Sequence, residues 1–425
     1  MKSKMQSRRC AKLTLILLFL TGCSPLLIIF FLVFTTVPTL KKPPLPQICN
    51  SSANCNLPLL WAPPENSTRT ATNAAAIAQS LSFRLYSFDP RTIAPYGMSR
   101  LCANRIVESG HVKFLCSSFD VIIIADTLPH GRPFLQYLAS GKHCKARVII
   151  ELTNRFNWEI KDSREYNKIV TRLISKNRVR VISNNRVEYA FLESTINYKI
   201  PLSFSSLSLE QQRQQTILRP LGIGPADTTW PQQYGSQNIS HFVSRANFCG
   251  RVYTSLQEQH EFPLVIIPAA KMYGGSTNLA QFKAFIDFPY QYSVMKFYEN
   301  IAFGVVQYIP TPRLWEEVLK TKLHCAWWAS PSVLKNLSSQ STKLKTNTTI
   351  TAIAGFPDWS AYMDYYDPLF EPYVYYFDSI DELLRLKEMT PGQVDWKNVR
   401  VNGPRFYEEY RVQILEGWKD LLLGG

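Results

Sequence analysis

The sequence lacks the short motifs that mark several common enzyme classes. It contains no C-x2-C pair and no H-E-x-x-H segment, which argues against a structural zinc site and against a zincin protease. It also has no G-x-S-x-G elbow, the turn that presents the nucleophilic serine of α/β-hydrolases. Charged residues make up only 19% of the 425 residues and apolar residues 46%, so the chain can bury a sizeable core and is not typical of a disordered protein.

A long uncharged run near the N-terminus sets the expected compartment. The formal net charge of +15 could by itself indicate a nucleic-acid partner. Residues 13–37, however, carry no charged side chain. At about 1.5 Å rise per residue such a run can span a hydrocarbon core of about 30 Å. Its apolar residues continue to Phe34, further than in a cleaved signal peptide, so we expect an uncleaved transmembrane signal anchor.

Charges on either side of this run predict its orientation. Residues 1–12 contain five Lys or Arg, whereas Lys41 and Lys42 are the first basic residues after the run. The positive-inside rule therefore predicts a cytoplasmic tail over 1–12 and a luminal chain beyond 37, which is a single-pass type II protein of the Golgi or another secretory-pathway membrane. N-glycosylation sequons, for example at Asn50 and Asn238, agree with a luminal glycoprotein. Nucleic acid is not an expected partner there.

The cysteines after the anchor are odd in number, so at least one is left over from intramolecular pairing. An oxidising lumen permits disulfides. By closeness in sequence, the candidate pairs are Cys49 with Cys55 and Cys102 with Cys116. The remaining cysteines are Cys144, Cys249 and Cys325.

The rest of the chain predicts a stalk and two α/β domains. Residues 38–80 begin with a proline-rich, extended stretch and read as a stalk. Residues 81–221 form the first expected domain, in which apolar β-branched runs alternate with helical patterns. This alternation predicts a parallel, Rossmann-like sheet, with an α+β domain containing antiparallel pairs as the alternative. The expected strands are 121–125, 147–152 and 179–182.

The second expected domain covers residues 222–403. It is followed by a helix over 404–425, which Pro404 suits in its first turn. Strand patterns again alternate with helical ones. The expected strands are 263–267, 282–286, 305–309 and 373–377.

The most informative segment runs from Asp287 to Pro310. Its pattern predicts a strand end, a loop, a helix over 294–303, a turn at Gly304 and another strand. Ser293 is a suitable N-cap for that helix. Glu299 is a lone carboxylate in an otherwise apolar and aromatic helix, and a buried acid needs a partner. A structural ion pair or a solvent-facing side chain is the alternative interpretation of Glu299.

This segment resembles the donor-binding signature of GT-B-fold glycosyltransferases, especially their large retaining group 1. Residues 299–306, ENIAFGVV, match the second half of the signature. Its second Glu corresponds to Glu299, which in the family holds the ribose hydroxyls of the sugar nucleotide. Its first Glu, which contacts the donor sugar, corresponds to Gln291, and this is a departure from the family. The expected architecture is also similar: two Rossmann-like domains, a crossover near residue 221, and a last helix packing back on the first domain.

The resemblance implies a GT-B-like α/β fold and a transferase that needs no bound metal and no cofactor. The substrates would be a nucleotide sugar and a glycan, glycoprotein or glycolipid acceptor, with retention at the anomeric carbon. The D-x-D metal motif of the other major glycosyltransferase architecture is absent, because Asp364 and Asp367 have the wrong spacing. Without a metal, cations and backbone amides must meet the charge of the leaving diphosphate. The candidate donor-binding residues are Glu299, Gln291, Tyr292, Ser293, Gly274, Gly275, Arg245, Arg251 and Lys271.

The acceptor is expected at the polar loops that follow the strands of the first domain, because ligands of parallel sheets bind at the carboxyl ends of the strands. Asp126 and His130 are the candidate catalytic bases in case the reaction inverts. Arg132, Asn154 and Arg155 are the candidate acceptor-side residues. Ordinary helix caps, solvated charges and simple turns are the structural alternatives for all of these residues.

Two other function classes remain open at the sequence level. A non-catalytic carbohydrate-binding or scaffold protein that keeps the glycosyltransferase fold is favoured by Gln291 at the first acidic position. An ectoenzyme of another class, such as a hydrolase, has no motif in its favour.

Overall fold

The computed structural model describes residues 58–61, 69–83, 85–88, 98–125, 128–157, 160–200, 217–222, 240–246, 249–268, 275–321, 330–344, 352–389 and 396–423. The expected cytoplasmic tail, the expected anchor over 13–37 and the proline-rich start of the stalk lie outside these ranges. Within the described ranges, no helix combines the length and apolar character needed to cross a bilayer.

The first domain is built on a five-stranded sheet with the strand order β2-β1-β3-β4-β5. All neighbouring strands pair in parallel. The strands predicted from the apolar runs are confirmed as β3, β4 and β5, and β3 is buried along its whole length, as expected for a strand covered on both faces. The bounds are β1 Pro58–Trp61, β2 Tyr86–Phe88, β3 Val121–Ile124, β4 Arg147–Leu152 and β5 Arg180–Ser183.

The predicted stalk over 38–80 is wrong in its C-terminal part. β1 lies inside the sheet, between β2 and β3, and pairs with both. Helix α1, Arg69–Ser80, also belongs to the domain, since Ala74 and Ile77 pack in its core. The four residues of β1 are too few to show a periodicity, and their place in the sheet depends on pairing with strands far along the chain.

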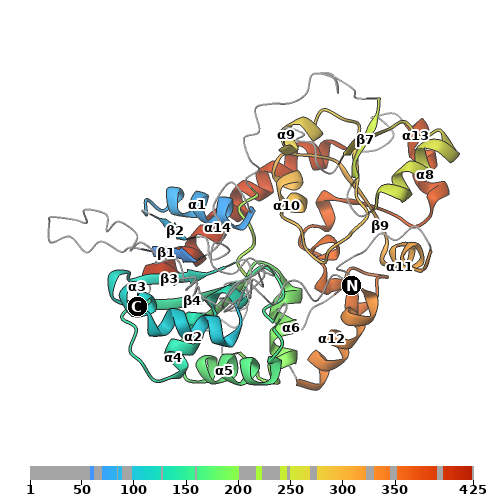
Figure 1. The fold of residues 1–425 in the computed structure, drawn as a ribbon. Helices are drawn as coiled ribbons and strands as arrows, with labels where there is room; N and C mark the ends of the chain where they lie inside the picture. The colour runs from blue at the N-terminus through green and yellow to red at the C-terminus, as the bar shows by residue number, and fades with distance from the viewer. Residues whose placement is uncertain are drawn as a thin grey trace, which may run out of the picture.

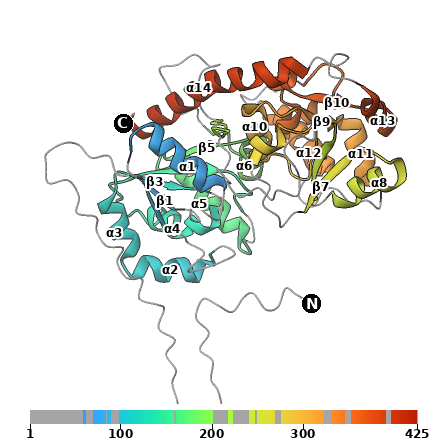
Figure 2. The same cartoon turned by 90° about the horizontal axis from the view of Figure 1, so that it is seen from above.

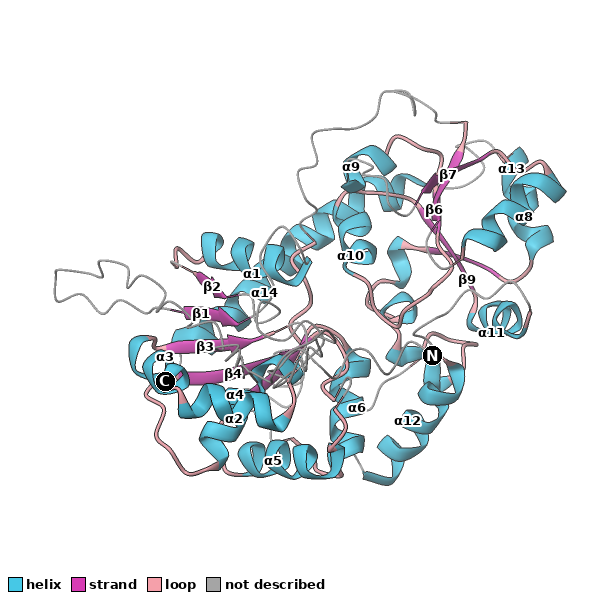
Figure 3. Ribbon diagram, in the orientation of Figure 1, coloured by secondary structure: helices cyan, strands magenta, loops and turns pink. Residues whose placement is uncertain are grey.

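The second domain has the same sheet topology as the first. Its five-stranded sheet has the order β10-β9-β8-β6-β7, again with parallel neighbours throughout. Counted from the first strand of each domain, both sheets have the order 2-1-3-4-5, and the two sheets form separate halves of the molecule (Figure 3). The predicted α/β class with parallel sheets is confirmed. The bounds are β6 Phe242–Ala246, β7 Leu264–Pro268, β8 Phe285–Ile286, β9 Gln307–Pro310 and β10 Tyr375–Phe377.

Helices flank both sheets (Figure 1). In the first domain they are α2 Arg100–Glu108, α3 His111–Ser118, α4 Arg132–Ala139, α5 Ser163–Ser175 and α6 Arg186–Ile196. In the second domain they are α8 Gly250–His260, α9 Gly275–Leu279, α10 Met295–Ala302, α11 Pro312–Lys320, α12 Pro331–Leu344 and α13 Ile380–Glu388.

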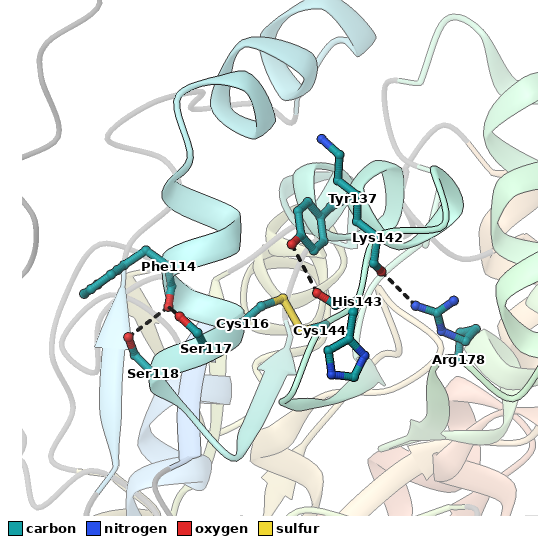
Figure 4. The surroundings of a disulfide bond; sticks show 9 residues. All are labelled: Phe114, Cys116, Ser117, Ser118, Tyr137, Lys142, His143, Cys144 and Arg178. Carbon is teal, nitrogen blue, oxygen red and sulfur yellow. Dashed lines mark hydrogen bonds between the residues drawn. A yellow bond between two sulfur atoms is a disulfide. The ribbon is translucent and has the colours of Figure 1, made fainter.

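The disulfide of the first domain differs from the predicted Cys102–Cys116 pair. Cys116 at the end of α3 is bonded to Cys144, which lies just before β4 (Figure 4). Cys102 is disulfide-bonded as well, with a partner that is not among the described residues. Closeness in sequence failed as a guide because the fold brings the end of α3 beside the start of β4, where Ala146 N donates to Cys116 O.

The last helix, α14, covers Gly403–Leu423 and runs along both domains (Figure 2). Its second half packs on the first sheet, where Ile414 and Trp418 share a core with Ile123 and Ile149. Arg147 of β4 donates to the carbonyls of Leu421 and Leu422 at the end of the helix, which satisfies backbone acceptors that have no partner within the helix. The helix thus ties the end of the chain to the first domain.

Candidate functional site

The shared strand order places a topological switch point in each sheet. The order reverses between β1 and β3 in the first domain and between β6 and β8 in the second. Ligands of open parallel sheets bind beyond the carboxyl ends of the strands at such points. The segments that follow β3, β6 and β8 are therefore the candidate binding segments, and the segment after β8 leads into α10.

Glu299 lies on α10 and is only 2% exposed. The neighbouring Phe297, Tyr298 and Ile301 are fully buried in the core of the second domain. At about 100° per residue, Glu299 lies on the other side of the helix from Phe297 and Ile301, on the same face as the half-buried Met295. The carboxylate is therefore buried on the face of α10 opposite the apolar core residues Phe297 and Ile301.

The residues just before α10 are placed differently from the prediction. Ser293 is not the N-cap, because the helix begins one residue later with Val294 as a cap that makes no side-chain hydrogen bond. The Ser293 hydroxyl is instead hydrogen-bonded to the carboxylate of Asp364. Tyr292 is buried, and its hydroxyl accepts from Ser330 N at 2.9 Å. Gln291 is half-buried in the same loop.

Two glycines with positive φ, Gly275 and Gly304, form the turns beside α10. Gly275 has a φ of +73° and is buried at the start of α9. The next residue, Ser276, donates to Asn300 Oδ1 at 2.8 Å, which fixes α9 against α10. Gly304 has a φ of +67°, and a Cβ there would lie 2.6 Å from Arg400 O, so only glycine fits. Gly274 and Lys271 lie outside the described residues.

The predicted cations of the second domain flank its switch point. Arg245 is the fourth of the five residues of β6 and is half-buried. Arg251 lies in the first turn of α8, the helix that follows β6, and is exposed. Both positions are next to the carboxyl end of β6, whereas Glu299 follows from β8 on the other side of the reversal.

A buried ion-pair network that the sequence did not predict joins the two domains. Arg219, in the crossover between them, pairs with Asp364 and with Asp367, the latter at 2.7 Å. It also donates to the Tyr298 hydroxyl at 3.0 Å, and Arg186 of α6 pairs with Asp367 at 3.2 Å. Burial alone would lower the pKa of Arg219, but its acidic partners outweigh this and hold that pKa well above the usual value.

Two of these partners are the aspartates whose spacing did not fit a metal motif. The carboxylates of Asp364 and Asp367 each form an ion pair with Arg219. Among the residues that the structure describes, no group of three or more His, Cys, Asp or Glu side chains is arranged to hold a metal ion.

Two predicted residues at the first switch point are buried. His130 lies in the short 3-10 helix Leu128–Gly131 and is 3% exposed. Arg132 is 1% exposed and binds the carboxylate of Asp162 with both guanidinium nitrogens, which lowers the pKa of Asp162. Arg132, which was predicted for the acceptor side, thus forms an ion pair that fastens α4 to the start of α5. Asp126 lies outside the described residues.

The loop after β4 brings a predicted acceptor-side residue to the other domain. Asn154 is exposed, and Arg155 beside it reaches across the domain boundary. The guanidinium carbon of Arg155 lies 4.1 Å from the ring centre of Phe191 on α6 and 5.3 Å from that of Tyr292. Arg155 Nε also lies 3.2 Å from a carboxylate oxygen of Glu188. Arg155, predicted for the acceptor side, thus contacts Tyr292, predicted for the donor side.

Glu188 is the functional candidate that sequence reasoning missed. It stands three residues after Asn185, whose side chain caps α6 by accepting from Glu188 N at 2.9 Å. Burial raises the pKa of Glu188 to about 7, while Arg155 opposes the rise. The N-x-x-E pattern after a strand was the available signal, because it predicts a helix start that projects a carboxylate near the carboxyl edge of the sheet.

Comparisons with known proteins are sparse. No protein-family model and no curated protein matches this chain. One matching solved structure is a glycotransferase of kitacinnamycin, with a TM-score of 0.33 and 10% sequence identity. The alignment covers 84% of this chain and 98% of that chain.

Proposed function

We propose that this chain is a membrane-anchored glycosyltransferase of the secretory pathway, which moves a sugar from a nucleotide sugar to a glycan, glycoprotein or glycolipid. The observation that carries the proposal is the buried carboxylate of Glu299 on the helix that follows β8, at the switch point of the second sheet. A carboxylate accepts hydrogen bonds from neighbouring hydroxyls, and an acidic residue at this type of sheet edge is a common ribose ligand. The anchor is residues 13–37, with the domains in the lumen.

The diphosphate of the donor belongs on the other side of the same switch point. Arg245 and Arg251 at the end of β6 supply positive charge there. As the bond to the sugar breaks, the leaving diphosphate gains negative charge, and fixed cations lower the free energy of that transition state. Gln291 and Tyr292 stand in the loop between β8 and Glu299, where the donor sugar is expected.

The proposed transfer uses no metal ion. This part of the proposal is supported by Asp364 and Asp367, the acidic pair nearest in spacing to a metal motif, which are both occupied by Arg219. Transfer should persist in excess EDTA. A reaction that stops with EDTA and resumes with Mn²⁺ or Mg²⁺ would contradict the proposed metal independence, but it would not contradict the proposed donor site.

The decisive experiment measures nucleotide binding by the full-length protein in detergent. UDP and GDP are titrated by calorimetry, and release of diphosphate from a panel of their sugar conjugates is followed. We expect Glu299→Ala to weaken binding at least about 10-fold, since each hydrogen bond to a charged group contributes about 1.5–3 kcal/mol. Glu316→Gln, a change on α11 whose partner is Lys335, should leave affinity unchanged. Equal affinity in the Glu299 variant would remove this residue from the site.

A non-catalytic carbohydrate-binding relative is the second candidate, and Gln291 at the position of the family's first acid favours it. That protein would bind a nucleotide or a glycan without releasing diphosphate. Binding without turnover across the whole panel of nucleotide sugars and acceptors would favour this candidate over the transferase.

A further inference from the structure

Glu188 lies where the first domain meets the second. It occupies the first turn of α6, directly beyond the carboxyl end of β5. Its neighbours on this helix contact the second domain: Arg186 pairs with Asp367 at 3.2 Å, and Val187 shares a core with second-domain residues. Because the same Asp367 binds Arg219, which in turn binds Tyr298 of α10, the helix of Glu188 is linked to the helix of Glu299.

Among the described residues, only one of the two carboxylate oxygens of Glu188 has a partner. Oε1 lies 3.2 Å from Arg155 Nε. Oε2 is buried and makes no hydrogen bond to any residue in the described part of the chain. A buried oxygen without a partner costs folding free energy, and a ligand hydroxyl that donates to it recovers part of that cost.

The charged and titratable groups around Glu188 leave Arg155 as its main counter-charge. Arg155 comes from the loop after β4, and Tyr292 faces the pair from the loop before α10. On α6 itself, Arg186 is directed to Asp367. On α12, which packs against α6, Lys335 is engaged by Glu316 at 2.8 Å. In the described part of the chain, Arg155 is therefore the cation that orients this carboxylate at the boundary of the two domains.

We propose that Glu188 is the general base of the transfer and that Arg155 is the residue that positions it. This inference rests on the proposed glycosyl transfer and names its acceptor-side chemistry. The acceptor hydroxyl gives its proton to Oε2 of Glu188. An oxygen lone pair of that hydroxyl forms the new bond to the anomeric carbon, and the electrons of the carbon–diphosphate bond leave with the diphosphate. Attack from the face opposite the leaving group inverts the anomeric configuration.

The ionisation of Glu188 suits this role. Burial raises its pKa to about 7, so the carboxylate is a stronger base than an exposed glutamate and is still ionised at slightly alkaline pH. A reaction that inverts differs from the retention implied by the resemblance to group 1. It would also explain why the first acidic position of that signature, Gln291, carries no charge.

The test compares three variants of the full-length protein, with the anomeric configuration of the product read by NMR. Glu188→Gln should lower kcat at least about 100-fold with little change in nucleoside diphosphate affinity. Glu188→Asp should restore part of the activity. Glu193→Gln is the matched control, since Glu193 is a buried carboxyl of the same helix with a pKa also raised to about 7 and, among the described residues, also has one buried oxygen without a hydrogen bond. It differs in its other oxygen, which accepts from Ile200 N at 3.0 Å, whereas Glu188 pairs with Arg155. That variant should keep kcat within about twofold.

The outcomes separate the two levels of the proposal. Wild-type kcat should rise through a pH of about 7, and the residual rate of Glu188→Gln should lack that rise. A retained anomeric configuration, or a Glu188→Gln kcat close to wild type, overturns the role of Glu188 while glycosyl transfer stands. A wild-type protein that transfers no sugar from any nucleotide sugar overturns both.

Discussion

Arg219 donates a hydrogen bond to the hydroxyl of Tyr298 at 3.0 Å, and this contact links the crossover between the domains to the helix that carries Glu299. Both side chains are buried, and Arg219 also holds two aspartates of the second domain. The position of Glu299 therefore depends on an arginine that does not belong to the proposed donor site. Changes to Arg219 should affect folding first and binding only as a consequence.

Replacement of Arg219 by Met should lower the free energy of unfolding by about 3–5 kcal/mol, because Asp364 loses its buried counter-charge and Asp367 keeps only its pair with Arg186. Adding Asp364→Asn and Asp367→Asn should recover part of the loss. Chemical denaturation measures both effects. Arg313→Met removes an exposed pair with Asp378 and is the control, for which we expect only a small change. A loss no larger than the control's would show that the buried network does not stabilise the fold.

Replacement of Gln291 by Glu should alter the choice among donor sugars. The side chain stands in the loop before α10, eight residues ahead of Glu299, where the resemblance places the donor sugar rather than the nucleotide. We expect the relative kcat/KM values for different nucleotide sugars to change, while the Kd for free UDP or GDP stays the same. Unchanged selectivity would place Gln291 away from the sugar.

Stability should depend on pH through buried carboxyls. Burial raises the pKa of Glu193 from 4.5 to about 7. The folded state therefore holds a proton that the unfolded state releases at lower pH. The stabilisation from this group is fully present below pH 4.5 and is lost as pH rises through about 7, by an amount on the order of 3 kcal/mol. Asp287, whose pKa burial also raises to about 7, acts in the same direction.

Replacement of Glu193 by Gln should remove its share of this dependence. The variant should gain stability relative to wild type at pH 8 and show little relative gain at pH 5. Thermal unfolding across this pH range is the measurement. A difference between the two proteins that does not vary with pH would contradict the raised pKa of Glu193.

The sequence by itself determined the strands and helices whose signal is local. The apolar run of β3 reveals a strand covered on both faces, and the pattern around Gly304 reveals the helix-turn-strand unit of the proposed donor site. These features depend on neighbouring residues, since periodicity and backbone freedom act over a few positions.

The tertiary structure alone decided which distant residues meet. Strand β1 has only four residues and gains its place through pairing with β2 and β3. Arg219 reaches Asp364 across 145 positions of sequence, and Arg155 meets Glu188 and Tyr292 from two different domains. Burial raises the pKa of Glu188 and strengthens its electrostatic interaction with Arg155. Because burial exists only after the chain has folded, no local sequence pattern could single out that pair.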